Sequence, residues 1–214
     1  MMQAQAVPHA NAKSAPNARD KLLGAALRLV REKGFDATAV DDLCKAEGVT
    51  KGAFFHHFSS KEELGVAATQ FWTKVTSKAF AEAGYHKFED PLDQLIGYVD
   101  FRIQLLEGRS LPEFTCLLGT MVQEKYGSSP IIRDACFEGI HTHATEVGKM
   151  IAAAKELHAP NASWGVESLA LHTQAVIQGA FILAKAKNDA AVAADMIRHL
   201  RRYIELLFHH GKED

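Results

Sequence analysis

Residues 48–58 read GVTKGAFFHHF and place two adjacent phenylalanines and two adjacent histidines within one short predicted helix. Thr50 is a favourable N-cap for that helix, because its hydroxyl can accept a backbone N–H of the first turn. Val49, Phe54 and Phe58 follow at spacings of five and four, so they can turn towards a common core. The other side chains of the stretch are left on or near the outer face of the helix.

The residues before this stretch predict two further helices and a tight turn. An apolar series at helical spacing follows Asn17 and ends at Gly34, where a left-handed C-terminal cap is expected. Thr38 and Asp41 form a capping-box pattern that opens a short helix, and Gly48 ends it. Two short helices joined by a turn of about four residues with a glycine form the helix-turn-helix unit, whose second helix enters the DNA major groove.

This interpretation gives the outer face of the second short helix a function in DNA binding. A small Gly52 lets the backbone approach a phosphate closely, and hydroxyl, imidazole and ammonium groups can donate hydrogen bonds to phosphate oxygens. His56 and His57 point about 100° apart on a helix, so a shared metal ion is not expected there, nor is any cofactor. The predicted DNA-binding residues are Thr38, Thr50, Lys51, Gly52, Ala53, Phe55, His56, His57 and Lys61.

Composition and charge agree with a DNA-binding protein that is not a membrane protein. The chain has 214 residues, 47% of them apolar, and a formal net charge of -2. Residues 13–61 carry nine Lys/Arg against six Asp/Glu, so the N-terminal part is positively charged and the remainder is acidic. No apolar run approaches the roughly 20 residues that span a bilayer, and the first residues lack the apolar core of a signal peptide. A cytoplasmic location with reduced cysteines is therefore expected.

The stretch from Thr38 to Leu64, TAVDDLCKAEGVTKGAFFHHFSSKEEL, resembles the N-terminal domain of the tetracycline-repressor (TetR) family. The resemblance implies a three-helix DNA-binding domain of a transcriptional repressor, and the helix before it, LLGAALRLVREKGF, matches as well. At one functional position the chain departs from the family pattern. The family commonly has a tyrosine where this chain has Phe55, so one phosphate contact made by a hydroxyl is in doubt.

The rest of the chain predicts an all-α fold without strands. Capping and helix-ending signals predict helices over residues 61–83, 90–108, 110–125, 131–157, 164–186 and 189–209. We therefore expect a disordered arm over residues 1–16, a helix-turn-helix domain over 17–60, and a ligand-binding and dimerisation domain over 61–214.

The last two predicted helices carry apolar side chains on more than one face, which indicates a second packing partner. The resemblance implies that this partner is the same pair of helices in a second subunit. A homodimer would place two recognition helices about one helical turn, roughly 34 Å, apart on a near-palindromic operator. The apolar positions are Ala170, Ala175, Ile177, Ala180 and Ile182 in one helix, and Val192, Met196, Leu200, Ile204 and Leu207 in the other.

The central helices are rich in apolar and aromatic residues with a few polar groups, the composition of a small-molecule cavity. The candidate effector-binding residues are Trp72, Phe101, Leu105, Phe114, Cys116, Met121, Phe137, His141, His172 and Gln178. Each of them singly is also an ordinary core residue. The segments CLLGTMVQE, SSPIIRD and QGAFILAKAK are similar to a branch of the family that senses electrophiles or oxidants through a cysteine. That similarity implies Cys116 as a redox sensor aided by a lysine, a cation that Lys185 or Lys187 would provide.

Two alternatives to a repressor released by a noncovalent effector remain open at this point. The first is a repressor that senses electrophiles or oxidants through Cys116. The second is an all-α enzyme or adaptor that contains a helical hairpin. Against an enzyme stands the lack, in the sequence, of a nucleophile–base–acid set at motif spacing, a phosphate-binding glycine loop or a set of four metal ligands.

Overall fold

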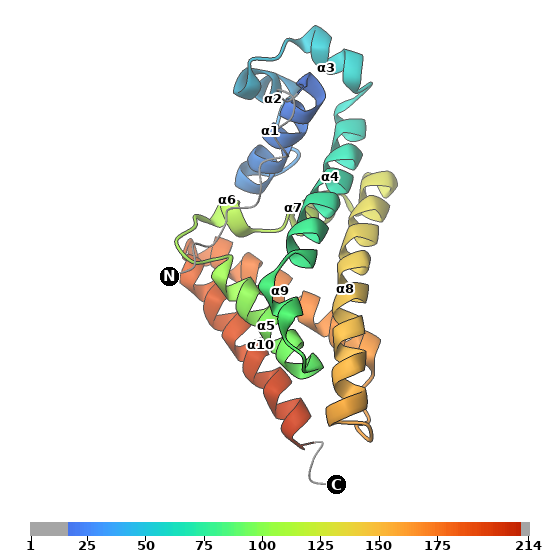
Figure 1. Ribbon diagram of the computed structural model, residues 1–214. Helices are drawn as coiled ribbons and strands as arrows, with labels where there is room; N and C mark the ends of the chain where they lie inside the picture. The colour runs from blue at the N-terminus through green and yellow to red at the C-terminus, as the bar shows by residue number, and fades with distance from the viewer. Residues whose placement is uncertain (1–16, 211–214) are drawn as a thin grey trace. The chain divides into compact units, whose positions relative to one another are not determined.

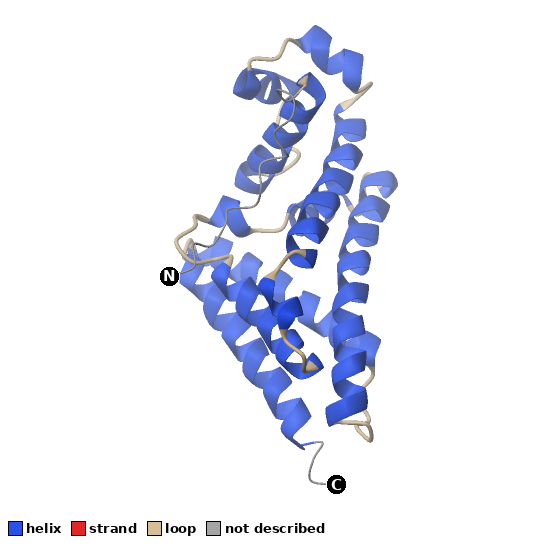
Figure 2. Ribbon diagram, in the orientation of Figure 1, coloured by secondary structure: helices blue, strands red, loops and turns tan. Residues whose placement is uncertain are grey.

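Helices make up the whole secondary structure of the part of the chain that the computed structural model describes, residues 17–210 (Figures 1 and 2). The all-α prediction is confirmed. The predicted arm over residues 1–16 lies outside the described range. The elements are α1 (Ala18–Lys33), α2 (Val40–Glu47), α3 (Lys51–His57), α4 (Lys61–Ala81), the 3-10 helix η1 (Gly84–Lys87), α5 (Pro91–Gln104), α6 (Leu111–Phe114), α7 (Leu117–Lys125), α8 (Pro130–His158), α9 (Val166–Lys187) and α10 (Ala190–His210).

The contacts divide the described chain into two units. One contains residues 17–79 and 115–139, and the other contains residues 80–114 and 140–210. The first holds the helix-turn-helix together with α7, most of α4 and the start of α8. These units are groups of contacts and do not test the predicted domain boundary at residue 60, which stays a prediction.

The helix-turn-helix unit is built as the local pattern predicts, apart from two caps. Gly34 ends α1 with φ 94° and ψ 161°, which lies outside the left-handed helical region expected there. The side chain of Asn17 accepts a hydrogen bond from the Asp20 amide at 2.9 Å, and Gly48 ends α2 in the left-handed region with φ 63°. The capping pattern at Thr38 and Asp41 is wrong by one residue. Ala39 is the N-cap of α2, and the Asp42 carboxylate accepts its backbone N–H at 3.0 Å. Thr38 is buried and belongs to the preceding turn.

The helix predicted over residues 110–125 is interrupted in the structure. Ser110 and Glu113 form the expected hydrogen bonds, and α6 begins there, but it ends after a single turn at Phe114. Cys116 has an extended backbone, and a new helix, α7, starts at Leu117. Neither of the two residues at the break, Thr115 and Cys116, is a glycine or a proline, so the sequence gives no local signal for it. Phe114 is the last residue of one unit and Thr115 the first of the other.

Helices α9 and α10 pack against each other, and α10 also contacts α5. A left-handed Asn188, with φ 53°, ends α9. The buried side of α10 consists of Ala193, Ile197, Leu200, Ile204 and Phe208. The apolar pattern predicts Ile204 on an exposed stripe that meets the second subunit, and this prediction is wrong, because the helical repeat turns Ile204, like Leu200, into the core of its own subunit. No helix within residues 17–210 is long and apolar enough to cross a membrane.

Candidate DNA-binding surface

Buried aromatic side chains and a cap fix the position of α3. The Thr50 hydroxyl accepts the Ala53 amide at 3.1 Å, and the Val49 amide donates to the Cys44 carbonyl at 2.9 Å. Phe54 is fully buried and Phe58 nearly so, with ring centroids 5.8 Å apart. The helix therefore packs on α1 and α2 through one side and leaves its other side to solvent.

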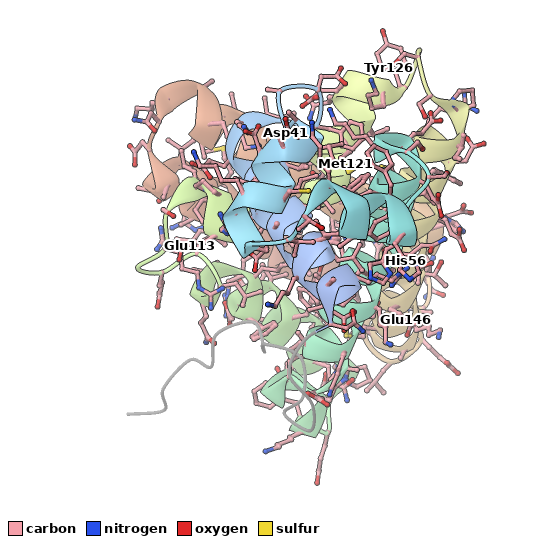
Figure 3. All side chains as sticks on the ribbon, turned by 90° about the horizontal axis from the view of Figure 1, so that it is seen from above. Asp41, His56, Glu113, Met121, Tyr126 and Glu146 are labelled. Carbon is pink, nitrogen blue, oxygen red and sulfur yellow. The ribbon has the colours of Figure 1, made fainter. Side chains whose placement is uncertain are left out.

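The opposite side of α3 is exposed and carries most of the predicted DNA-binding residues. Lys51, Gly52, Phe55 and His56 are exposed, and Phe55 keeps 57% of its surface in solvent. Figure 3 shows His56 on α3 and Asp41 on the neighbouring helix α2. Ala53 and His57 are half-buried. Among residues 17–210 no group of three or more His, Cys, Asp or Glu side chains could hold a metal ion.

Phe55 is a large apolar side chain in solvent, and covering it with a binding partner would gain free energy, because apolar surface would leave water. In the chain, Phe55 contacts the edge of Phe54, with ring centroids 5.1 Å apart, and is otherwise on the surface. A DNA sugar or a thymine methyl group would cover such a ring.

Thr38 does not lie on the exposed side of this unit. Its side chain is 1% exposed, and its hydroxyl donates to the Gly34 carbonyl at 2.7 Å. The prediction of a side-chain contact from Thr38 to DNA is therefore wrong, because the hydroxyl already satisfies a carbonyl in the α1–α2 turn.

The ammonium groups of Lys51 and Lys61 have different surroundings. Lys51 is exposed and pairs with Asp41 at 2.8 Å, which raises its pKa. Lys61 is half-buried, and its Nζ donates to the Asp36 carbonyl at 3.2 Å and lies 4.6 Å from the centre of the Phe35 ring. Burial lowers the pKa of Lys61. An ammonium group has three N–H donors, so Lys61 retains hydrogens for a phosphate.

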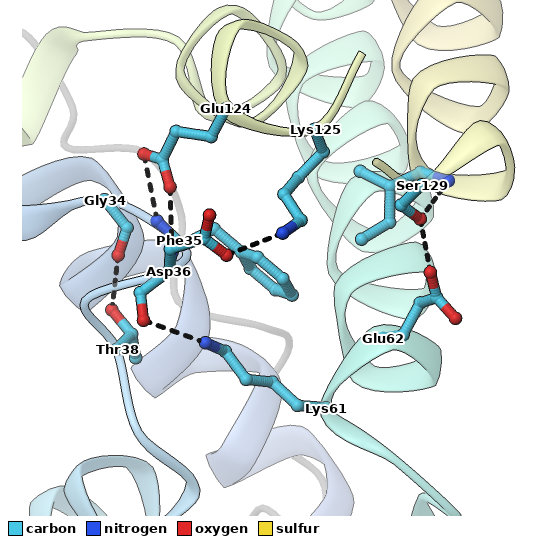
Figure 4. A network of polar contacts seen from close by, with 10 residues as sticks. Gly34, Phe35, Asp36, Thr38, Lys61, Glu62, Glu124, Lys125 and Ser129 are labelled. Carbon is cyan, nitrogen blue, oxygen red and sulfur yellow. Dashed lines mark hydrogen bonds and ion pairs between the residues drawn. The ribbon is translucent and has the colours of Figure 1, made fainter. Parts of the chain in front are cut away.

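A polar network holds the α1–α2 turn against α7 (Figure 4). The Glu124 carboxylate accepts the backbone N–H groups of Phe35, at 3.2 Å, and Asp36, at 2.8 Å. Lys125 pairs with the Asp36 carboxylate at 2.7 Å. Gly34 has φ 94°, and a β-carbon there would lie only 2.5 Å from a Glu124 oxygen, so this position requires glycine.

The same network reaches the first turn of α4. The Ser129 hydroxyl donates to the Glu62 carboxylate, and it also accepts the Ile132 amide at 3.4 Å. Together with Lys61, this connects the beginning of α4 to the α1–α2 turn and to the start of α8 (Figure 4). Glu124, Lys125 and Ser129 were not identified from the sequence. Their partners lie 67–89 residues away in the chain, beyond the range of a local pattern.

The residues predicted to bind an effector fall into both units. Trp72, Cys116, Met121 and Phe137 belong to the unit with α3. The other unit contains Phe101, Leu105, Phe114, His141, His172 and Gln178.

These residues differ in burial. Met121 is fully buried, whereas Phe137 is 63% exposed and His141 is exposed. His172 is exposed beside Tyr203, with ring centroids 5.1 Å apart. A shared cavity for the whole set stays a prediction.

The three cysteines have different environments. Cys44 and Cys136 are buried, and Cys116 is partly exposed at the N-cap of α7. Burial raises the pKa of Cys44, and burial with some charge repulsion from Cys116 raises that of Cys136 to about 12. Lys185 is exposed in the last turn of α9, in the other unit.

A recognition helix with one buried and one exposed side, supported by two helices, defines a helix-turn-helix DNA-binding protein. Residues 22–68 match the family described as "Bacterial regulatory proteins, tetR family". The chain is a TetR-family transcriptional regulator with an N-terminal helix-turn-helix domain. Proteins of this family are DNA-binding regulators rather than enzymes, which removes the enzyme alternative.

Relatives of known name match over most of the chain. The transcriptional repressor DhaR of Mycobacterium sp. (strain GP1) is 24% identical over 80% of this chain and 84% of its own length. The transcriptional regulator AcuR of Cereibacter sphaeroides is 26% identical over 78% of this chain and 76% of its own. The crystal structure of the reduced form of E. coli NemR shares the fold. Its TM-score is 0.72 at 23% identity, over 87% of this chain and 96% of that one.

Proposed function

We propose that the protein is a homodimeric repressor that binds a near-palindromic operator through α3 and leaves it when a small-molecule effector binds. The exposed side of α3, with Lys51, Phe55 and His56 in solvent beside a buried Phe54, is the observation that carries the proposal. The proposed DNA contacts are Thr50, Lys51, Gly52, Ala53, Phe55, His56, His57 and Lys61.

The contacts of Lys51 support a base-reading function for this residue. Its ammonium is exposed at the N-terminus of α3, which is the end of a recognition helix that meets base edges. In the free protein the Asp41 carboxylate occupies the place that a guanine edge or a phosphate would take. Because both side chains of this pair are exposed, exchanging Asp41 for a DNA group as the partner of Lys51 costs little free energy.

The exposed apolar side chains of α9 and α10 support dimerisation through these helices. Leu171 and Ile182 of α9, and Tyr203 and Leu206 of α10, each keep between 42% and 55% of their surface exposed. Leu171 and Ile182 lie eleven residues apart, and Tyr203 and Leu206 lie three residues apart, so each pair shares one side of its helix. A β-carbon at Gly179, on the same side of α9, would meet no atom within 4 Å. A partner helix could approach closely at that position.

The first turn of α4 supports a route from effector to DNA. Lys61 and Glu62 contact the α1–α2 turn and Ser129, respectively, so a shift of α4 would move the support of the recognition helix. An effector changes operator affinity only if it binds the two arrangements of α4 unequally. Operator release by an effector is thus a population shift between two arrangements of this helix.

A mobility-shift assay with the DNA upstream of the protein's own gene tests the proposal. The variant Lys51→Ala tests the contribution of this one side chain in the same assay. We expect the variant to lose roughly 1–3 kcal/mol of operator binding and to tolerate other bases at one position of each half-site, because a base contact is removed. Lys45→Ala, on the exposed side of α2, is the matched control. Unchanged affinity and specificity in Lys51→Ala would remove Lys51 from the base contacts.

Release through thiol chemistry is the second candidate, and the partial exposure of Cys116 favours it. A soft electrophile or hypochlorite should modify Cys116 faster than the buried Cys44 and Cys136, because the thiolate form and access control the rate. We expect Cys116→Ser to retain operator binding and to lose release by such reagents, measured by mobility shift with melting temperature as control. Undiminished release would leave a noncovalent effector as the better explanation.

A further inference from the structure

An aromatic and polar cluster lies in the unit formed by residues 80–114 and 140–210. Phe80 and Tyr98 are buried, with ring centroids 5.8 Å apart, and Phe101 meets Phe80 edge-on at 5.4 Å. The imidazole of His143 lies 4.7 Å from the Phe80 ring. One charged side chain, Arg102, lies within this group of rings.

Arg102 is held among these residues without a carboxylate. Its Nε donates to the Tyr98 hydroxyl at 3.1 Å, and its Nη2 donates to His143 Nε2 at 2.6 Å. Its Cζ lies 4.3 Å from the centre of the Phe80 ring. These neutral groups are the guanidinium's only polar and aromatic partners among residues 17–210, and Nη1 has no acceptor there. The nearby Asp100 carboxylate pairs with Arg201 at 2.8 Å instead.

Nε2 of His143 can only accept in this arrangement. The Tyr98 oxygen accepts from Arg102 and, at a long 3.5 Å, from Gln174, so its own hydrogen points to His143 Nε2 at 3.0 Å. Burial first, and the Arg102 charge second, lower the pKa of His143 well below its usual value, so the ring is neutral. One imidazole lone pair thus faces two donors. The cluster has more N–H and O–H groups than acceptors.

We infer that Arg102 binds the carboxylate of a small organic acid whose apolar part lies against Phe80 and Phe101. Arg102 is half-buried beside aromatic rings and pairs with no carboxylate among residues 17–210, so a ligand carboxylate would supply both a counter-charge and an acceptor for Nη1. The planar guanidinium matches a carboxylate through parallel N–H bonds. This inference rests on the proposed function, since it assigns a chemical class to its effector.

The charge of the cluster favours a carboxylate over a phosphate group. Arg102 supplies one formal positive charge, which balances the single negative charge of a carboxylate, whereas a phosphate monoester carries nearly two at neutral pH. The surrounding rings of Phe80, Tyr85 and Phe101 suit an aromatic or short aliphatic tail.

The test uses the full chain and pairs of probes that differ only in charge. Benzoate, phenylacetate and the straight-chain fatty acids from butyrate to decanoate are titrated by calorimetry, each beside its uncharged amide. We expect at least one acid to bind and its amide to bind at least about tenfold more weakly. Arg102→Met should weaken the binding of that acid by at least about tenfold, whereas the exposed Arg198→Met should not.

Melting temperature separates a binding residue from a structural one. In Arg102→Met the Tyr98 hydroxyl still donates to His143, so no buried acceptor loses its partner. We expect an unchanged or raised melting temperature without ligand, and Arg102→Lys is the second variant. The inference is overturned if no acid in the series binds, if an acid binds wild type and Arg102→Met equally, or if both variants melt well below wild type. Operator binding in the same samples tests the proposed function independently.

Discussion

Replacing Phe54 with alanine is expected to destabilise the DNA-binding unit by about 3–5 kcal/mol and to abolish operator binding. Phe54 has no exposed surface and fills the space between α3 and its two supporting helices. Alanine would leave a cavity there, and the short helix α3 has little stability of its own to compensate. Thermal melting and mobility shift on the same preparation measure the two effects.

Phe55→Ala is the control, because it removes the same aromatic ring from the next position of the helix. Phe55 is mostly in solvent, so its loss should change the free energy of unfolding by no more than about 0.5 kcal/mol. Any loss of operator affinity in Phe55→Ala would then come from a lost DNA contact rather than from unfolding. Equal destabilisation of the two variants would contradict the assignment of buried and exposed sides to α3.

The second large effect is expected from Leu206→Asp in α10. If the exposed apolar sides of α9 and α10 form the dimer interface, this change buries an unpaired carboxylate on each side of the twofold axis. We expect monomers in sedimentation and an operator affinity lower by at least about 100-fold, roughly 2.7 kcal/mol, because each recognition helix must then bind alone. The fold of the single subunit should be retained, since Leu206 is more than half exposed.

Two further variants make this test specific. Gly179→Leu adds bulk where a β-carbon meets no atom of its own subunit, so it should disturb only a partner helix. Leu157→Asp places a carboxylate on a similarly exposed leucine of α8 and should leave the dimer intact. An unaltered dimer in both Leu206→Asp and Gly179→Leu would place the interface elsewhere. Ile204 is unsuitable for this purpose, because aspartate there would disrupt the subunit core.

Local patterns predicted what neighbouring residues determine. The cap at Thr50, the end of α2 at Gly48 and the apolar spacing of Phe54 and Phe58 all depend on residues within one or two helical turns. For the same reason α4, α8, α9 and α10 lie within a few residues of their predicted bounds. The burial of Thr38 was not predicted, because the sequence does not show which neighbour takes its hydroxyl hydrogen.

Tertiary contacts decided the features that the sequence did not reveal. The break between α6 and α7 contains no helix-breaking residue. Arg102 and His143 lie 41 residues apart, and neither position has a distinctive local pattern. Periodicity assigned Ile204 to an apolar face correctly but could not distinguish a face that packs within the subunit from one left exposed.

The two hydrogen bonds that Glu124 accepts have a consequence for how the chain is assembled. Both donors are backbone amides, so no side-chain change at residues 35 and 36 other than proline removes them. During synthesis, the turn emerges from the ribosome almost ninety residues before the carboxylate that satisfies it. Until α7 arrives, those amides are bonded to water. A fragment limited to the first four helices would therefore possess every proposed DNA contact and still lack the group that fixes the turn behind them.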